Sequence, residues 1–358
     1  MAAELINPPP SVPPALALRM SQQAPRILQQ SSGPSLPYPL SLLTASEAPE
    51  TWIGYENLML ACLRTGDDRS ARICLEKLTQ RFGEDNERVM ALRGMYHEAV
   101  AEDYKALESI FRGYEEVLKK DPTNMPIRKR RVALLKAMNR PIDATTALVG
   151  LLDASPTDAE AWAELADLYL TQNLYAQAIF SLEEVLLITP NAWNIHARMG
   201  EILYLSSLAT NSNNDGNLMR GLCESMRRFC RSIELCDNYL RGYYGLKLVR
   251  PLAHFHSPQQ PLSTNTSTNN PLKQTTKHLL SLLSKTSKPA PAAADPQFGD
   301  LAPPSLATIE RLHELATAKL AEIVRRNAAG ESGWDGYDQA EVIAAGELLG
   351  RDAQKIER

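Results

Sequence analysis

The sequence has few of the residues that build metal sites, disulfide frameworks or catalytic centres. Its 358 residues include six histidines and five cysteines. The cysteines are Cys62, Cys74, Cys223, Cys230 and Cys236. Their number is odd, and no two of them form a Cys-x-x-Cys pair. This spacing matches neither a zinc site nor a disulfide framework. We therefore predict reduced cysteines in helical cores, no bound metal and no cofactor.

A secretory leader and a long apolar run are also missing. Glu4 and the run from Pro8 to Pro10 stand where a signal peptide would have a basic start and an apolar stretch. The apolar run from Leu279 to Leu283 is broken by Ser281, far short of the roughly 20 residues that cross a bilayer. The formal net charge of -4 disfavours nucleic acid as the main partner. We expect a cytosolic protein that associates with membranes only indirectly.

What the sequence does contain is a repeat between Ala159 and Ala192. Positions 4, 7, 8, 11, 20, 24, 27 and 32 of a 34-residue tetratricopeptide unit are filled by Trp162, Leu165, Ala166, Tyr169, Ala178, Leu182, Val185 and Pro190. Positions 4, 7 and 11 share one face of a first helix, and positions 20, 24 and 27 share one face of a second. One such hairpin leaves its apolar faces exposed, so neighbouring repeats must cover them.

Neighbouring units are present at the same period. One unit back, the second-helix positions hold Ala144, Leu148, Leu151 and Pro156. One unit forward, the repeat positions fit the 34-residue spacing as far as Leu203. The second-helix positions fit again only after extra residues, which predicts a loop insertion at residues 206–217. The first repeat begins at Trp52. We predict five repeats plus a capping helix, with Trp52, Trp162 and Tyr169 in the core.

The flanks differ from the repeats in composition. Residues 1–48 are rich in Pro, Ser and Gln, which predicts a mostly disordered segment with at most a brief helix between Ala15 and Gln30. Residues 251–303 are richer still in Ser, Thr, Asn and Pro and are predicted to be a low-complexity linker.

Order is expected to return after that linker. An amphipathic stripe with Ser305 as its N-cap predicts a capping helix over residues 304–329. Residues 330–358 are expected to form a tail with a short helix from Tyr337 to Leu349. The predicted fold is therefore all-α: a tetratricopeptide-repeat helical solenoid over residues 49–250, with C-terminal capping helices.

The candidate binding surface is the concave groove lined by first-helix positions 2, 5, 9 and 12. In three successive repeats these positions hold Lys129, Ala133 and Lys136, then Glu160, Ala163, Asp167 and Leu170, then Asn194, Ala197, Glu201 and Tyr204. The groove is predicted to change from basic to acidic, which would orient a partner segment of opposite charge order. No nucleophile–base pair or phosphate-binding glycine loop occurs in the sequence, so we predict neither an enzyme nor a small-molecule substrate.

Several segments outside the repeat consensus point to one family. They are Trp52-Ile-Gly-Tyr-Glu-Asn-Leu-Met-Leu-Ala, Cys74-Leu-Glu-Lys-Leu, Arg93-Gly-Met, Asp121-Pro-Thr-Asn followed by Arg128-Lys-Arg-Arg, and Ala161-Trp-Ala-Glu-Leu-Ala. Their order resembles the subunit 2 family of the endoplasmic reticulum membrane protein complex, from about Thr51 to Leu248. The resemblance implies a peripheral scaffold on the cytoplasmic side of that membrane. The complex inserts transmembrane segments, including tail-anchored ones, without spending nucleotide. The partners implied are cytosolic segments of its membrane-embedded subunits and another soluble subunit.

Two other functions stay open from the residues alone. A chaperone co-factor that binds the C-terminal peptide of a heat-shock protein needs Lys and Asn at positions 5 and 9 of one repeat. Here Lys129 is followed by Ala133, and Ile53 by Asn57. An RNA-associated repeat scaffold would use the basic run from Arg128 to Arg131. That run lacks interleaved aromatic residues, so it is a weak signal for RNA and equally fits a solvated helix face.

Overall fold

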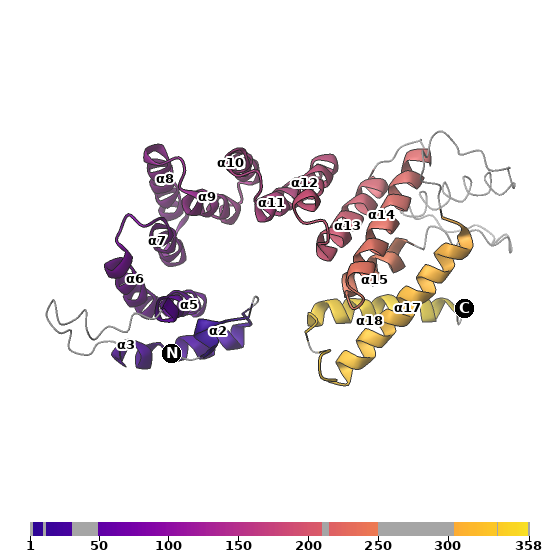
Figure 1. Ribbon diagram of the computed structural model, residues 1–358, viewed down its shortest axis with the longest axis horizontal. Helices are drawn as coiled ribbons and strands as arrows, with labels where there is room; N and C mark the ends of the chain where they lie inside the picture. Colours follow the sequence, from indigo (N-terminus) through magenta and orange to yellow (C-terminus); the bar gives the residue numbers. More distant parts are fainter. Residues whose placement is uncertain are drawn as a thin grey trace. The chain divides into compact units, whose positions relative to one another are not determined.

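The chain is helical throughout the part that the structure describes. This computed structural model describes residues 3–9, 12–30, 49–209, 215–249, 304–334 and 336–356, and none of these residues lies in a strand (Figure 1). The chain divides into two compact units, an N-terminal unit of Met1–Pro156 and a C-terminal unit of Thr157–Arg358. The predicted all-α tetratricopeptide-repeat solenoid is confirmed by the helical hairpins of each unit.

Three helical hairpins form the repeats of the N-terminal unit. They are α5 (Pro49–Thr65) with α6 (Asp68–Phe82), α7 (Glu87–Val100) with α8 (Tyr104–Lys120), and α9 (Met125–Ala137) with α10 (Pro141–Ala154). Side chains cap four of these helices: Asp67, Asn86, Asp103 and Asn124 each accept a backbone N–H of the turn that follows. A non-glycine residue in the left-handed region, Asn139 with φ 56°, makes the tight turn from α9 to α10.

Among the described residues, three further helices precede the first repeat, where mostly disordered chain was expected. They are α1 (Ala3–Ile6), α2 (Pro14–Gln22) and α3 (Ala24–Gln30). Leu5 and Met20 are 0% and 2% exposed in one core with Leu58 of α5. Asn57 of α5 donates its side-chain N–H to the Leu5 carbonyl at 2.8 Å.

The disorder predicted for residues 1–48 is therefore wrong for residues 3–9 and 12–30. Composition misled because Pro14 occupies the first turn of α2, where the fixed φ of proline suits a helix start. Residues 31–48 lie outside the described part of the chain.

The C-terminal unit continues the repeat with two further hairpins. Its repeats are α11 (Ala159–Thr171) with α12 (Tyr175–Ile188), and α13 (Trp193–Ala209) with α14 (Asp215–Leu235). The loop predicted over residues 206–217 is shorter than expected, because helix covers both of its ends. The buried Ser207 donates its hydroxyl to the Leu203 carbonyl at 2.7 Å, and Leu218 is 7% exposed. Residues 210–214 lie outside the described residues.

The last helices close the end of this unit. They are α15 (Leu240–Val249), α17 (Leu306–Ala328) and α18 (Gln339–Ile356), and α17 packs along α15 (Figure 1). Ser305 caps α17 by accepting the Thr308 N–H at 3.2 Å, the cap expected for residues 304–329. Helix α18 is longer than the short helix expected in residues 330–358. The predicted linker, residues 251–303, lies outside the described residues.

Helix α17 packs against α15, and the two together form a further helical hairpin. Leu320 and Ile323 of α17 are at most 1% exposed in a core shared with Tyr243 and Leu246 of α15. Inside this contact, Lys247 is 2% exposed and donates to the Thr317 hydroxyl at 3.0 Å. Apolar surface at the end of the repeats is thus covered by the chain itself.

The predicted consensus residues differ in how deeply they are buried. Leu165, Ala166 and Ala178 are at most 2% exposed. The aromatic residues expected in the core, Trp52, Trp162 and Tyr169, are only partly buried and pack against the edges of two hydrophobic clusters. The exposed prolines Pro156 and Pro190 follow the ends of α10 and α12.

The five cysteines are free thiols. Burial raises the pKa of Cys62 and of Cys74 to about 12. Both side chains are therefore protonated at neutral pH and act as small apolar core residues.

Candidate partner-binding pockets

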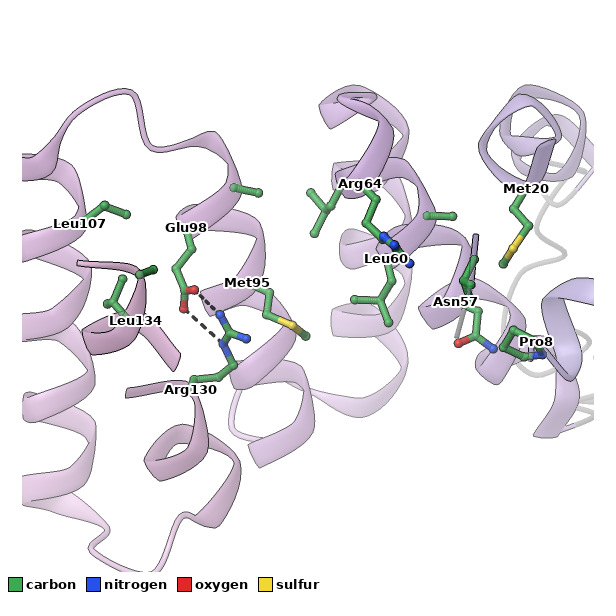
Figure 2. Close-up of a pocket in the computed structure, with 15 residues that line it drawn as sticks. Pro8, Met20, Asn57, Leu60, Arg64, Met95, Glu98, Leu107, Arg130 and Leu134 are labelled. Atoms are coloured by element: carbon green, nitrogen blue, oxygen red, sulfur yellow. Dashed lines mark hydrogen bonds and ion pairs between the residues drawn. The ribbon is translucent and has the colours of Figure 1, made fainter. Parts of the chain in front are cut away.

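The first helices of the N-terminal unit border an open cavity of about 590 Å³, the N-terminal pocket (Figure 2). It is lined by Asn57, Leu60, Ala61, Leu63 and Arg64 of α5, Met95, Glu98 and Ala99 of α7, Leu107 of α8, and Arg130, Leu134 and Ala137 of α9. Pro8, Val12 and Met20 of the N-terminal segment complete its wall. Apolar side chains dominate this lining, and the helices that precede the first repeat are part of it.

A partly buried ion pair lies in the wall of the N-terminal pocket (Figure 2). Arg130 on α9 contacts both carboxylate oxygens of Glu98 on α7, with Nε 3.2 Å from Oε1. Tyr114 on α8 donates its hydroxyl to the same Oε1 at 2.5 Å, and burial together with this bond raises the pKa of Tyr114. The Glu98 and Arg130 side chains are only 13% and 24% exposed. Because the two charges neutralise each other, the pocket presents a largely apolar surface.

The basic run is engaged in contacts within the N-terminal unit. Arg128 donates to the carbonyls of Pro122 at 2.6 Å and Gly150 at 2.7 Å. Arg131 pairs with Glu115 at 2.8 Å, and Arg130 pairs with Glu98. These three arginines tie α7, α8, α9 and α10 together, which favours a structural role and weakens the RNA hypothesis.

The groove positions predicted in the third repeat do not line the N-terminal pocket. Lys129 and Lys136 are exposed on α9, and Ala133 is half-buried. The pocket uses Arg130, Leu134 and Ala137 of the same helix instead, each the next residue along the chain. The repeat pattern did not reveal these residues, because it assumes that every first helix turns the same face to the groove.

The groove positions predicted in the fifth repeat border a second cavity. A cavity of about 210 Å³, the C-terminal pocket, lies between α13 and α15. All four predicted positions of that repeat line it: Asn194, Ala197, Glu201 and Tyr204. Further lining comes from Phe229 of α14 and from Tyr239, Arg241 and Tyr244 at and within α15. Sequence reasoning missed these residues, although the density of tyrosines from Tyr239 to Tyr244 was a visible signal.

The acidic positions of the C-terminal unit are partly neutralised. Glu160 and Asp167 are exposed on α11, with Ala163 and Leu170 half-buried beside them. Arg198 of α13 bridges two predicted groove carboxylates, at 2.7 Å from Asp167 and 2.7 Å from Glu201. The change of sign predicted along one groove involves residues of both units and stays a prediction.

The described residues contain neither a metal-ion cluster nor a membrane-spanning helix. No three His, Cys, Asp or Glu side chains gather there in an arrangement that could hold a metal ion. None of the helices in the described ranges combines the length and the hydropathy needed to span a membrane.

The repeats match known proteins. Residues 84–213 match the family model described as the EMC2 TPR-like repeat domain. The TPR repeat protein oca3 of Schizosaccharomyces pombe is 35% identical over 197 residues, which are 55% of this chain and 65% of that protein. ER membrane protein complex subunit 2-B of Xenopus laevis is 34% identical over 55% of this chain and 61% of its own length. The chain thus spans less than two thirds of these relatives.

A solved structure, the thermophilic TPR protein TTC0263 of Thermus thermophilus, is 19% identical, with a TM-score of 0.36, over 53% of this chain and 99% of that one. The family-model match spans three of the segments outside the repeat consensus, those that begin at Arg93, Asp121 and Ala161. The resemblance seen in the sequence is therefore confirmed over residues 84–213, where this chain is similar to the EMC2 TPR-like repeat domain.

Proposed function

We propose that this chain is a non-catalytic scaffold subunit of an endoplasmic reticulum membrane protein complex. The observation that carries the proposal is the EMC2-type match over residues 84–213, which falls on the helical hairpins from α7 to α13. As a peripheral subunit on the cytoplasmic side, the chain would hold cytosolic segments of membrane-embedded subunits and another soluble subunit. It would thereby support insertion of transmembrane segments, including tail-anchored ones, without nucleotide hydrolysis.

The chemistry of the N-terminal pocket supports a protein partner. Its lining is mostly apolar, it is open to solvent, and its central charges are paired with each other. Such a surface suits the apolar side chains of a partner segment, which repeat proteins bind on their inner helices. The buried apolar area would supply most of the affinity.

The alternative of a heat-shock chaperone co-factor gains no support from the geometry. A clamp for a C-terminal carboxylate needs accessible basic and amide donors on first helices. Asn57, the one asparagine found at the required position, already donates its amide to the Leu5 carbonyl. Arg198 is engaged by Asp167 and Glu201.

Affinity purification of the full chain in mild detergent tests the proposal. We expect integral membrane proteins to be recovered in fixed stoichiometry with the chain. Recovery of soluble heat-shock chaperones alone would contradict the scaffold function.

Charge reversal tests the predicted basic end of the groove. The double substitution Lys129→Glu and Lys136→Glu on α9 should reduce the recovery of membrane proteins while helicity by circular dichroism stays unchanged. Lys119→Glu with Lys120→Glu is the matched control, because these lysines are exposed at the end of α8, a second helix. Equal losses in both double variants would show that net charge matters and the groove position does not.

A further inference from the structure

The C-terminal pocket gathers polar groups that the fold leaves unused. Tyr204, Tyr239 and Tyr244 are half-buried, and their hydroxyls have no hydrogen-bond partner among the described residues. The same holds for the side-chain amide of Asn194 at the exposed edge of the pocket. Burial raises the pKa of Tyr204 and Tyr239, so both hydroxyls keep their protons and remain donors at neutral pH. Four neutral polar groups therefore converge on one cavity.

The charged groups of the pocket, in contrast, are already paired. Arg198 bonds to Asp167 and Glu201, at 2.7 Å each. Arg241 bonds to Glu341 of α18, with its Nη2 2.6 Å from Oε1. A ligand with a net charge would have to break one of these pairs. The lining therefore favours a neutral ligand that accepts hydrogen bonds.

Size and shape narrow the ligand further. The walls are aromatic, and Phe229 of α14 contributes its ring. Gly245 lets α15 approach that ring, since a Cβ there would overlap it. A cavity of about 210 Å³ is smaller than the roughly 300 to 1,000 Å³ typical of small-molecule sites. It has room for one or two residues of an extended chain and is too small for a helix.

We propose that the C-terminal pocket binds an extended, proline-containing segment of a partner protein. Proline rings pack well on aromatic faces, as in other domains that read such segments. A polyproline II backbone makes no internal hydrogen bonds, so its carbonyls are free to accept from the tyrosine hydroxyls and from Asn194. The inference rests on the proposed scaffold function, because it names the chemistry of a segment that the scaffold holds.

Fluorescence anisotropy with the full chain and a labelled decaproline peptide tests this. The comparison peptide is a labelled (Gly-Ser)5 peptide of the same length. We expect decaproline to bind at least tenfold more tightly. Removal of two hydroxyls by Tyr204→Phe and Tyr239→Phe, which keeps both rings, should weaken binding by roughly tenfold.

The matched control is Tyr175→Phe, which removes a hydroxyl of the same unit that bonds to Asn173 at 3.2 Å and does not line the pocket. It should leave peptide affinity unchanged, and circular dichroism should show equal helicity in all variants. Equal affinity for the two peptides, or wild-type affinity in the Tyr204 and Tyr239 double variant, would overturn the inference. Tighter binding of decalysine or decaglutamate than of decaproline would overturn it as well.

The outcomes of the peptide-binding and copurification experiments distinguish the pocket inference from the scaffold function. If membrane proteins copurify but decaproline does not bind, the scaffold function stands and the pocket inference is lost. If decaproline binds but no membrane protein copurifies, the pocket stands as a peptide site and the membrane-complex function is lost.

Discussion

The two pockets arise from the same repeat geometry yet differ in their chemistry. The N-terminal pocket is apolar, and its Glu98–Arg130 ion pair lies in the wall with side chains 13% and 24% exposed. The C-terminal pocket is aromatic, and the Asp167–Arg198 pair near it has side chains 59% and 32% exposed. Repeats of one family thus build surfaces suited to different partner segments, because inner helix positions are free of the packing constraints that fix the consensus.

Burial decides what each ion pair does for stability. An exposed pair is solvated when it breaks, so it contributes little. A buried pair whose one partner is removed leaves a charge without solvent or counter-charge, which is costly. Substitutions at the two pairs should therefore have unequal effects on the free energy of unfolding.

The largest effect is expected at Glu98. Glu98→Ala leaves the Arg130 guanidinium without its carboxylate and the Tyr114 hydroxyl without its acceptor. We expect a loss of about 3 kcal/mol in the free energy of unfolding. Urea unfolding followed by circular dichroism measures it, and hydrogen exchange should show the loss in α7, α8 and α9.

The double variant Glu98→Leu with Arg130→Met is the control for that prediction. It replaces both charges with apolar side chains in an apolar wall and should cost about 1 kcal/mol or less. If the double variant is as unstable as Glu98→Ala, packing and not charge is what Glu98 supplies.

A smaller effect is expected where the N-terminal helices join the first repeat. Asn57→Ala removes the donor to the Leu5 carbonyl and should cost about 1 kcal/mol. Limited proteolysis should then cut the chain before α5 more readily. In a chain that lacks residues 1–30 the same substitution should have almost no effect. A full effect in that shortened chain would show that the bond to Leu5 is not the cause.

The two units are also expected to differ in how much stability they lose at low pH, because His196 lies in the core of the C-terminal unit. Burial lowers the pKa of His196 below its ordinary 6.5, with a bond to the Pro190 carbonyl opposing the shift. As the pH falls, the unfolded chain therefore binds a proton at His196 more readily than the folded chain does. Stability from this group is complete above pH 6.5 and declines as the pH falls below it.

Urea midpoints measured between pH 5.5 and 7.5 test the prediction for His196. His196→Gln should show a shallower decline than the wild-type chain, whatever its stability at pH 7.5. Parallel declines in the two chains would assign the acid sensitivity to other groups.

How far the sequence predicts this structure depends on local packing. The repeat at Ala159–Ala192 was predictable because residues such as Leu165 and Ala178 are fully buried at fixed spacing. The helices α2 and α3 were not predictable from composition, because their order depends on a core shared with α5. One wall of the C-terminal pocket could be located at Asn194, Ala197, Glu201 and Tyr204, whereas Tyr239 and Tyr244 come from chain beyond the last predicted repeat. Repeat positions specify what a helix buries better than what it exposes.

The smallest loss of stability is expected at Asp167. Asp167→Asn removes one carboxylate from Arg198 but leaves Glu201 bonded to it at 2.7 Å. Because the Asp167 side chain is 59% exposed, the loss should be a few tenths of a kcal/mol, about a tenth of that for Glu98→Ala. High salt should abolish even this difference, since exposed ion pairs are screened. A loss as large as that at Glu98 would mean that exposure does not decide how much an ion pair contributes, and burial would no longer explain why the two pairs differ.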